Sequence, residues 1–301
     1  MLWLSIALVA HVANALVFVV DKSLLGSRNS VGQPLVYAFY SALLAGAAGV
    51  LLLFQYTPLT QFVALWSLLA GGAHLVALWL LFSAMKAGEP SRVIPTAGSA
   101  VPLFTLLFAP AVLGEALTVQ QMVAVILLIV GGGLLAVRLG SWHTVFFPAV
   151  GTSVMAGAFF ALHFTAMKFV YASTDVFLPV FGYSRLVEAL LALVVLGPLV
   201  LIQQHVPARP AYASLLVVPA VFVGNKVLAA GAFVLQNYAI SLGSVTIVNA
   251  LQGVQYLFLL ALAVAISRWK PRLFQEELHR VALVQKVVGI VWVGAGLALL
   301  V

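Results

Sequence analysis

Residues 84–133 read AMKAGEPSRVIPTAGSAVPLFTLLFAPAVLGEALTVQQMVAVILLIVGGG, and much of this stretch recurs in residues 239–296. The run AMKAG at its start is matched by AISLG at the start of the second stretch, and Gly98 is matched by Gly253. Both matches lie about 155 positions further along the chain. The sequence is therefore predicted to contain two copies of one unit.

A second set of matches has a longer offset. Gln120 is matched by Gln285 and Gly131 by Gly296, both about 165 positions further along. The second copy thus carries about ten additional residues, which we assign to a charged loop over Arg268–Glu277. Self-similarity at a fixed period inside an apolar chain is typical of transporters with internal repeats.

The composition indicates a membrane protein. Of 301 residues, 64% are hydrophobic and 7% are charged, which is too little polar surface to cover a globule in water. The net charge of +7 comes from basic residues scattered singly in short loops, so nucleic acid is not an expected partner. Cysteine is absent, which excludes disulfides, thiolate metal sites and a cysteine nucleophile. We expect a multi-pass protein of the inner or plasma membrane of the cell.

Hydrophobic length predicts ten transmembrane helices, because a helix needs about 20 apolar residues to cross the bilayer. The first five segments are 2–20, 34–54, 62–85, 91–112 and 118–137. The second five are 145–170, 176–202, 212–240, 244–267 and 281–300. The first segment lacks a basic leader and a clear cleavage site, so we interpret it as a spanning helix and not as a signal peptide.

The predicted fold is all-α and polytopic, with two five-helix repeats over residues 1–140 and 141–301. Because five is odd, two like repeats joined head to tail cross the membrane in opposite senses. They form an inverted repeat about an axis in the membrane plane. In such transporters the substrate site lies between the halves near the bilayer midplane, and it opens alternately to each side.

The basic residues predict the orientation. Eleven of them fall on one side of the predicted topology, against Lys168 alone on the other. The eleven are Lys22, Arg28, Lys86, Arg92, Arg138, Arg209, Arg268, Lys270, Arg272, Arg280 and Lys286. The positive-inside rule makes that side cytoplasmic and places both termini outside.

Several motifs together resemble the EamA-type transporters of the drug/metabolite transporter superfamily, and the resemblance covers essentially the whole chain. The motifs are PLF at 102–104, LGEALTVQQ at 113–121 and the glycines at 131–133. In the second half, Glu276 or Glu277 matches the loop glutamate and KVVG at 286–289 matches the start of the last helix.

Further matches are the lysines Lys22 and Lys168, which close the first helix of each repeat, and Arg185 in the second helix of the second repeat. The first half departs from this pattern, with Tyr40 and Ser41 at the arginine position. The resemblance implies five-helix repeats, a cavity lined by the first four helices of each half, and metabolite efflux. It also implies cytoplasmic termini, against the charge distribution.

Charged groups within the spans are candidates for substrate binding, because each costs about 2.5–3.5 kcal/mol at the centre of a helix. Arg185 and Glu188 lie three residues apart and share a helix face, with Tyr183 nearby. A structural ion pair explains this motif as well as a role in substrate or proton coupling does. Lys226, beside Asn225, is too deep to reach either interface, and Glu188 is its nearest predicted partner by depth.

Polar residues also recur on single faces of other segments, and we expect them to line the central cavity. They are His11, Asn14, Phe18 and Asp21 in the first segment, Thr96 and Ser99 in the fourth, Ser153, Phe160 and His163 in the sixth, and Asn249, Gln252 and Tyr256 in the ninth. For His11 and His163, hydrogen-bonded packing is an equal alternative, and for His74 it is the favoured one.

The predicted charges favour a substrate class. Lys226 and Arg185 against Glu188 leave an excess of positive charge in a cleft of low dielectric constant, which attracts carboxylates and repels organic cations. Amino acids and similar zwitterions or anions are therefore preferred.

The motifs of an enzyme are missing, because the sequence has no HExxH, no GxSxG, no P-loop and no DxD-type acidic cluster. We expect no cofactor and no metal. The leading hypothesis is a secondary transporter of a small metabolite, with export preferred from the resemblance and with protons, uniport or exchange open as coupling modes. The alternatives are a lipid-linked headgroup flippase and a membrane scaffold or receptor. Membrane lipid and a second copy of the chain are further possible partners.

Overall fold

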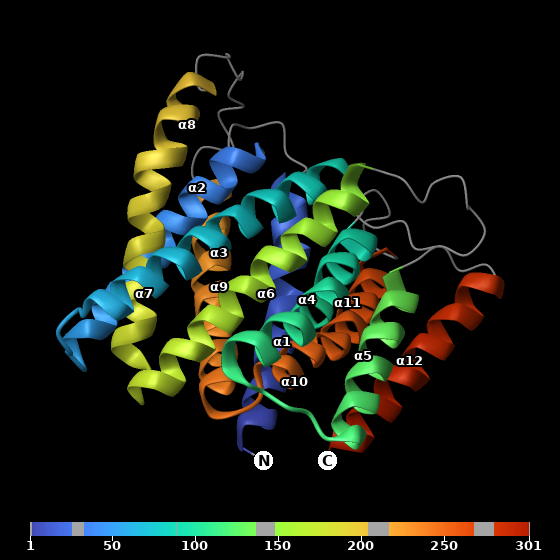
Figure 1. The fold of residues 1–301 in the computed structure, drawn as a ribbon. Coiled ribbons are helices and arrows are strands. Elements are labelled where there is room, and N and C mark those ends of the chain that lie inside the picture. Colours follow the sequence, from blue (N-terminus) through green and yellow to red (C-terminus); the bar gives the residue numbers. More distant parts are fainter. Residues whose placement is uncertain are drawn as a thin grey trace.

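The computed structural model describes residues 2–25, 33–88, 90–136, 148–203, 217–267 and 280–300. These residues are helical apart from short connections, and none of them forms a strand. Figure 1 shows the arrangement. The predicted loop insertion at Arg268–Glu277 and the loop arginines Arg28, Arg138 and Arg209 lie outside the described residues.

Helices occupy the described parts of the predicted segments. In the first half they are α1 (Leu2–Leu25), α2 (Pro34–Ala45) with its 3₁₀ continuation η2 (Gly46–Leu53), α3 (Gln61–Ala87), α4 (Pro90–Leu113) and α5 (Val119–Ala136). In the second half they are α6 (Pro148–Thr174), α7 (Leu178–Leu191), the π-helical turn η4 (Ala192–Leu196), α8 (Gly197–Gln203), α9 (Val217–Leu242), α10 (Val245–Ala250), α11 (Gln252–Ser267) and α12 (Arg280–Leu300).

Eight helical stretches of the described chain are long and apolar enough to cross a membrane. The helices α5 and α12 contain shorter apolar stretches, Val119–Leu134 and Val284–Leu300. Large apolar side chains such as Leu190, Val194 and Ile202 point outward, as expected of a surface in contact with lipid. The protein is thus an all-helical membrane protein.

Local chemistry sets several helix ends. The side chain of Thr60 accepts a hydrogen bond from the backbone N–H of Val63 at the start of α3, and Ser244 caps α10 through Ile247 in the same way. Both satisfy N–H groups that a helix start leaves unpaired. Beyond α4, Gly114 adopts a φ of 63°, a conformation in which glycine is favoured and which ends the helix.

The glutamate of the LGE motif joins two of these helix ends. Glu115 follows α4, and its carboxyl accepts a hydrogen bond from the hydroxyl of Ser244 at the start of α10. Partial burial raises the pKa of the Glu115 carboxyl, and the Ser244 hydrogen bond opposes that shift. This motif residue therefore ties the two halves of the chain together outside the spans.

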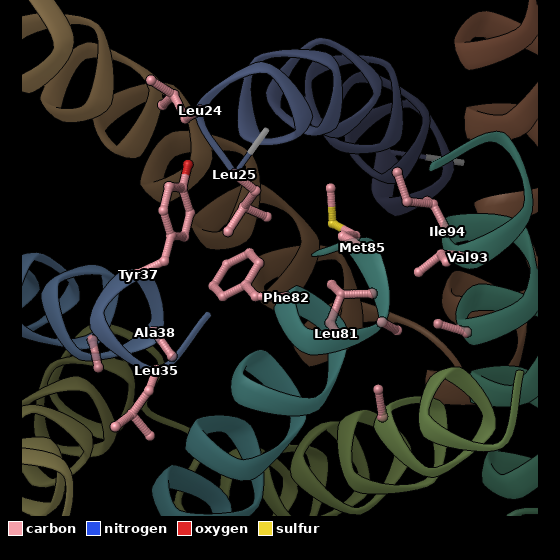
Figure 2. Close-up of a cluster of buried hydrophobic side chains, with 14 of the residues drawn as sticks. Leu24, Leu25, Leu35, Tyr37, Ala38, Leu81, Phe82, Met85, Val93 and Ile94 are labelled. Atoms are coloured by element: carbon pink, nitrogen blue, oxygen red, sulfur yellow. The ribbon is translucent and has the colours of Figure 1, made fainter. Parts of the chain in front are cut away.

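The helices form one bundle. In Figure 1, α5 and α12 lie side by side at one edge and α2, α7 and α8 at the opposite edge, with both termini at the same end. Between these edges α3 packs along α6, and α1 packs along α9 and α11. The cores of the bundle are apolar clusters, one of which includes Tyr37, Phe82 and Met85 (Figure 2).

The antiparallel pair α5 and α12 is held by two equivalent hydrogen bonds. Nε2 of Gln120 donates to the carbonyl of Leu299 at 2.7 Å, and Nε2 of Gln285 donates to the carbonyl of Leu134 at 2.5 Å. Each amide thus bonds near the end of the partner helix. Gln120 and Gln285 are the residues that the sequence repeat matches.

Glycine allows these two helices to approach closely. A Cβ atom at Gly131 would lie 2.9 Å from both the carbonyl of Gly289 and the backbone nitrogen of Val293, and one at Gly296 would lie 2.9 Å from the carbonyl of Ala124. Small residues at helix contacts are the usual means of close packing in membranes.

We therefore expect Gly131→Ala to destabilise the protein. The added methyl group meets backbone atoms that cannot rotate away, and such overpacking costs about 1–3 kcal/mol. Thermal unfolding of the purified protein in detergent measures the change. Gly133→Ala is the matched control, because nothing lies within 4 Å of its new Cβ. Equal melting temperatures for the two variants would contradict the close packing of α5 on α12.

Candidate functional site

A cavity of about 170 Å³ lies between the two halves of the chain. Its walls come from α1, α2, α3 and α4 of the first half and from α6, α7, α9 and α11 of the second. The polar side chains in its walls are Asn14, Asp21, Ser41, His74, Arg185, Lys226, Gln236, Gln252 and Gln255. Phenylalanine and small aliphatic residues supply most of the remainder. Such a mostly apolar cavity with a few polar groups is typical of a small-molecule site.

The cavity lies towards the end of the bundle opposite the termini. Its lining residues on α1, α3 and α4 fall in the parts of these helices nearest Leu25, Ala87 and Pro90. These helix ends are joined, because Nζ of Lys22 donates to the carbonyl of Gly88 at 2.8 Å and Nζ of Lys86 donates to the carbonyl of Leu25 at 2.8 Å.

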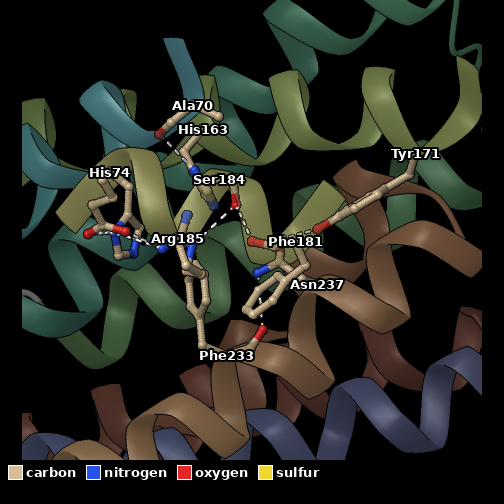
Figure 3. A network of polar contacts seen from close by, with 10 residues as sticks. Ala70, His74, His163, Tyr171, Phe181, Ser184, Arg185, Phe233 and Asn237 are labelled. Atoms are coloured by element: carbon tan, nitrogen blue, oxygen red, sulfur yellow. Dashed lines mark hydrogen bonds and ion pairs between the residues drawn. The ribbon is translucent and has the colours of Figure 1, made fainter. Parts of the chain in front are cut away.

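One wall holds a buried cluster of charge around Glu188. Nη1 of Arg185 lies 2.5 Å from Oε2 of Glu188, and Nδ1 of His74 lies 2.7 Å from Oε1. Arg185 and Glu188 are 2% and 0% exposed. The guanidinium also lies 4.9 Å from the ring centre of Phe233, a favourable cation–π distance. Figure 3 shows His74 and Arg185 approaching each other from different helices.

One N–H donor group of this cluster has no hydrogen-bond partner among the described residues. Nη2 of Arg185 is buried and has no hydrogen-bond partner in the described part of the chain, although Arg185 lines the cavity. A buried guanidinium N–H without a partner is costly, and a carboxylate is the acceptor that suits it best. Arg185 is therefore a candidate anion-binding residue.

Small residues seat α7 deep enough to bring Arg185 and Glu188 to the cavity. A Cβ atom at Gly46 of η2 would lie 2.6 Å from Cβ of Ala189, and one at Gly71 of α3 would lie 3.1 Å from the backbone nitrogen of Glu188. The helix α7 is thus clamped between η2 and α3, and larger residues at these glycines would push the charged cluster outward.

A second histidine packs against this cluster. Nδ1 of His163 donates to the carbonyl of Ala70 at 2.9 Å, and its ring centre lies 4.8 Å from that of His74. Nε2 of His163 is buried without a partner among the described residues. Nearby, the hydroxyl of Tyr171 donates to Oδ1 of Asn237 at 3.3 Å (Figure 3).

The opposite wall contains an ion pair between α1 and α9. Nζ of Lys226 lies 2.9 Å from Oδ1 of Asp21, and Nδ2 of Asn225 donates to the same oxygen at 2.7 Å. The hydroxyl of Tyr37 is a third donor to this oxygen. Lys226 and Asp21 are 9% and 2% exposed, so the pair is almost fully removed from water.

Amide side chains form the floor of the cavity on the side of the termini. Nδ2 of Asn14 donates to Gln236 at 3.4 Å, Nε2 of Gln236 to Asn249 at 3.4 Å, and Nδ2 of Asn249 to Thr105 at 3.3 Å. This chain of hydrogen bonds crosses from α1 through α9 and α10 to α4. His11 lies beside it and contacts Gln255 and the carbonyl of Val248.

Comparison with known protein families gives a match to the first part of the chain. Residues 1–137 match the model of the EamA-like transporter family. The match covers 137 of the 301 residues of the chain. The motif resemblance in the first half of the sequence is thereby confirmed.

The fold is also found among solved structures. One crystal structure matches over 98% of this chain and 96% of its own, with a TM-score of 0.65 and 17% sequence identity. At that identity the match shows the fold alone. No curated protein matches the sequence.

The structure places several of the predicted site residues in the cavity and others behind it. Asn14, Arg185, Lys226 and Gln252 line the cavity. Glu188, Asn225, Asn249, Tyr256, His11 and His163 lie behind it, in contact with lining residues. Their role in substrate binding stays a prediction.

Two predicted residues are not brought to the cavity. The hydroxyl of Tyr183 donates to the carbonyl of Thr57 at 2.6 Å, near the end of the bundle where η2 ends and α7 begins. The hydroxyl of Ser99 is buried without a partner among the described residues and faces Gly132 of α5. Neither residue is among those that line the cavity.

The predicted partner of Lys226 was wrong. Glu188 is occupied by Arg185 and His74, and Lys226 pairs with Asp21 instead. The expected excess of positive charge is wrong for the same reason, because two buried cations face two buried acids. Depth along the sequence could not identify the partner, since several helices pass each depth and their neighbours depend on the packing.

Several lining residues were not predicted as such. Asp21, with Phe18 and Phe160, was expected in the cavity and lines it, but the pairing of Asp21 with Lys226 was not predicted, and His74 was interpreted as packing. Gln236 and Gln255, polar residues inside apolar spans, carry a signal that could have identified them. Ser41 and the other phenylalanines of the cavity, Phe82, Phe164, Phe181 and Phe233, carry none, because such residues are common in any span.

A double-substitution experiment tests the Arg185–Glu188 pair. Glu188→Leu leaves the guanidinium buried without its acid and is expected to destabilise the protein by about 3–5 kcal/mol. Arg185→Met with Glu188→Leu should recover most of that loss, because no unpaired charge remains. Unfolding in detergent measures both, with the exposed Asp175→Asn as control. A double variant as unstable as Glu188→Leu would mean that the loss does not come from the unpaired charge.

Proposed function

We propose that this protein is a secondary transporter made of two inverted five-helix repeats, residues 1–140 and 141–301. The equivalent hydrogen bonds of Gln120 and Gln285 support this arrangement. They relate two antiparallel helices by a two-fold axis perpendicular to both. Such an axis lies in the membrane plane when the helices span the membrane, as the inverted repeats of transporters require.

Equivalent lysine contacts in the two halves support the same symmetry. Nζ of Lys22, near the end of α1, donates to the carbonyls of Met85 and Gly88 at the end of α3. Nζ of Lys168, near the end of α6, donates to the carbonyl of Ser241 at the end of α9. Each lysine thus joins the first helix of its half to the carbonyl end of the third, where positive charge is favourable.

Transport by alternating access fits the position of the cavity. Its walls come from both halves, so a movement of one half against the other changes its shape. The amide floor between α1, α9, α10 and α4 separates the cavity from the end of the bundle that carries the termini. A lateral headgroup flippase needs a cavity open to lipid, and a scaffold needs no buried charges at membrane depth.

A small zwitterion such as an amino acid is the proposed substrate, with export preferred from the family. The free Nη2 of Arg185 in the cavity wall carries this proposal, because it offers a donor to a carboxylate. The charges of the cavity already balance as two pairs. A lone anion would add an uncompensated charge to this buried site, whereas a zwitterion adds none.

Transport in proteoliposomes tests this function. Counterflow of a panel of amino acids, nucleosides and cationic dyes should identify a zwitterionic substrate, with an imposed pH gradient as a test of proton coupling. Arg185→Gln, which removes the free donor together with the ion pair to Glu188, should reduce transport per amount of folded protein at least about tenfold, the loss expected for a hydrogen bond to a charged group. Asp175→Asn should transport normally. Selective movement of cationic dyes, or normal transport by Arg185→Gln, would refute the proposal.

The orientation has its own test, because the native chain has no cysteine to remove. From the basic loops we expect Gln55→Cys and Ser173→Cys, exposed at the end of the bundle with the termini, to react with an impermeant maleimide added to intact cells. Ala87→Cys, exposed at the other end, should react after permeabilisation. The reverse pattern would restore the family's usual orientation.

A further inference from the structure

The ammonium group of Lys226 lies in a cage of aromatic rings. Nζ is 4.4 Å from the ring centre of Tyr37, 5.0 Å from that of Phe82 and 5.5 Å from that of Phe222. Tyr37 packs edge-on against both phenylalanines, at 4.7 Å and 5.0 Å. Figure 2 shows Tyr37 and Phe82 side by side. Aromatic cages of this kind bind ammonium groups through the negative faces of the rings.

The cage contains more acceptors than Lys226 uses. The ammonium makes one polar contact among the described residues, to Oδ1 of Asp21, which also receives the hydroxyl of Tyr37 and the amide of Asn225. Oδ2 of Asp21 receives none of these bonds, and Oδ1 of Asn225 is buried without a partner in the described chain. An ammonium group with three N–H donors could bond to both.

The cage opens onto the cavity. Asp21 and Phe82 line the cavity wall, as does Lys226 itself, while Tyr37 and Phe222 form the closed side. An ammonium group in the cavity is therefore adjacent to the site that Lys226 fills. Lys226 enters from α9 on a flexible four-carbon stem, so it can leave the cage while its backbone stays in place.

We propose that Tyr37, Phe82, Phe222 and Asp21 form a binding site for alkylammonium groups, in which Lys226 is a tethered occupant that the ammonium of a substrate displaces. The proposal rests on the proposed transport of zwitterions and names how their cationic end is received. One cation replaces another beside Asp21, so the buried carboxylate of Asp21 keeps a partner. The displaced Lys226 ammonium is then available to the carboxylate of the same substrate.

Tethering explains why a simple amine is expected to bind weakly to the native protein. A group held by a short flexible linker competes at an effective concentration on the order of millimolar or more. A free alkylammonium must exceed that concentration to displace Lys226. A zwitterion has an advantage, because its carboxylate pairs with the lysine that it displaces.

Removal of the Lys226 side chain gives the decisive experiment. Propylammonium chloride is titrated into purified protein in detergent, with sodium chloride to match ionic strength, and binding is followed by calorimetry and by the shift in melting temperature. Lys226→Ala should bind propylammonium at least about tenfold more tightly than the wild type, because the tethered competitor is gone. Lys168→Ala, which removes a lysine outside the cavity, should bind as the wild type does. Equal affinity in Lys226→Ala and wild type would overturn the proposal.

A second variant separates the cage from a general effect of the lost lysine. Asp21→Asn with Lys226→Met leaves no buried charge in the cage and should fold, but it should not bind propylammonium. Recovery of folded Lys226→Ala only when propylammonium is present during purification would also support the site. Tight binding by the double variant would place the ammonium elsewhere and overturn the proposal.

Displacement can be measured in the native protein. Saturating propylammonium should raise the rate of acetylation of Lys226 by an amine-reactive ester relative to that of Lys168 in the same sample, followed by peptide mass spectrometry, because the displaced ammonium leaves Asp21. The ratio of the two rates corrects for ester consumed by propylamine. An unchanged rate would show that Lys226 stays in the cage and would overturn the exchange. These binding experiments need no transport, so inactivity of proteoliposomes would count against the proposed function alone.

Discussion

The structure depends on the pairing of buried charge. In the described residues the four buried charged side chains form two pairs, Arg185 with Glu188 and Lys226 with Asp21. An unpaired charge at this depth is far too costly to keep, so each group constrains where its partner's helix can lie. The Lys226 pair joins α1 of the first half to α9 of the second, and His74 of α3 joins the Glu188 cluster from the other half. The charges that line the cavity thus also hold the two halves together.

Small residues make these pairings possible. The contact of His74 with Glu188 across helices, at 2.7 Å, requires α3 and α7 to approach closely, and Gly46, Gly49 and Gly71 provide a close approach around α7. The glycines of α5 and α12 do the same at the far edge of the bundle, where no charge is involved. Packing in lipid gains little from the hydrophobic effect, so close contact supplies much of the stability. The positions of the charged side chains on α7 therefore depend on uncharged glycines in the neighbouring helices.

The spans could be predicted from the sequence and the site only in part. Hydrophobic length is set by the bilayer, so eight of the ten predicted segments coincide with helical stretches long and apolar enough to span, with shifted ends, for example at Leu25 in place of residue 20. The contact of Arg185 with Glu188 follows from a spacing of three on one helix. The partner of Lys226 could not be predicted, because it depends on which helices become neighbours. The 3₁₀ segment η2 and the π turn η4 could not be predicted either. Both continue an apolar helix, and the spacing of their apolar residues does not distinguish them from it.

The same charges bear on how substrate and conformation can be linked. A ligand shifts a conformational equilibrium only by its difference in affinity for the two states. In the proposed movement of one half against the other, the cross-half contacts of Asp21 with Lys226 and of His74 with Glu188 have to change, and in the empty protein that change exposes charges without partners. A zwitterion brings one group of each sign and can replace the lost partners. Its binding therefore lowers the cost of leaving the present state, whereas an uncharged ligand of the same size leaves that cost in place. Cavity charges that balance without substrate are thus suited to couple the movement to a zwitterion.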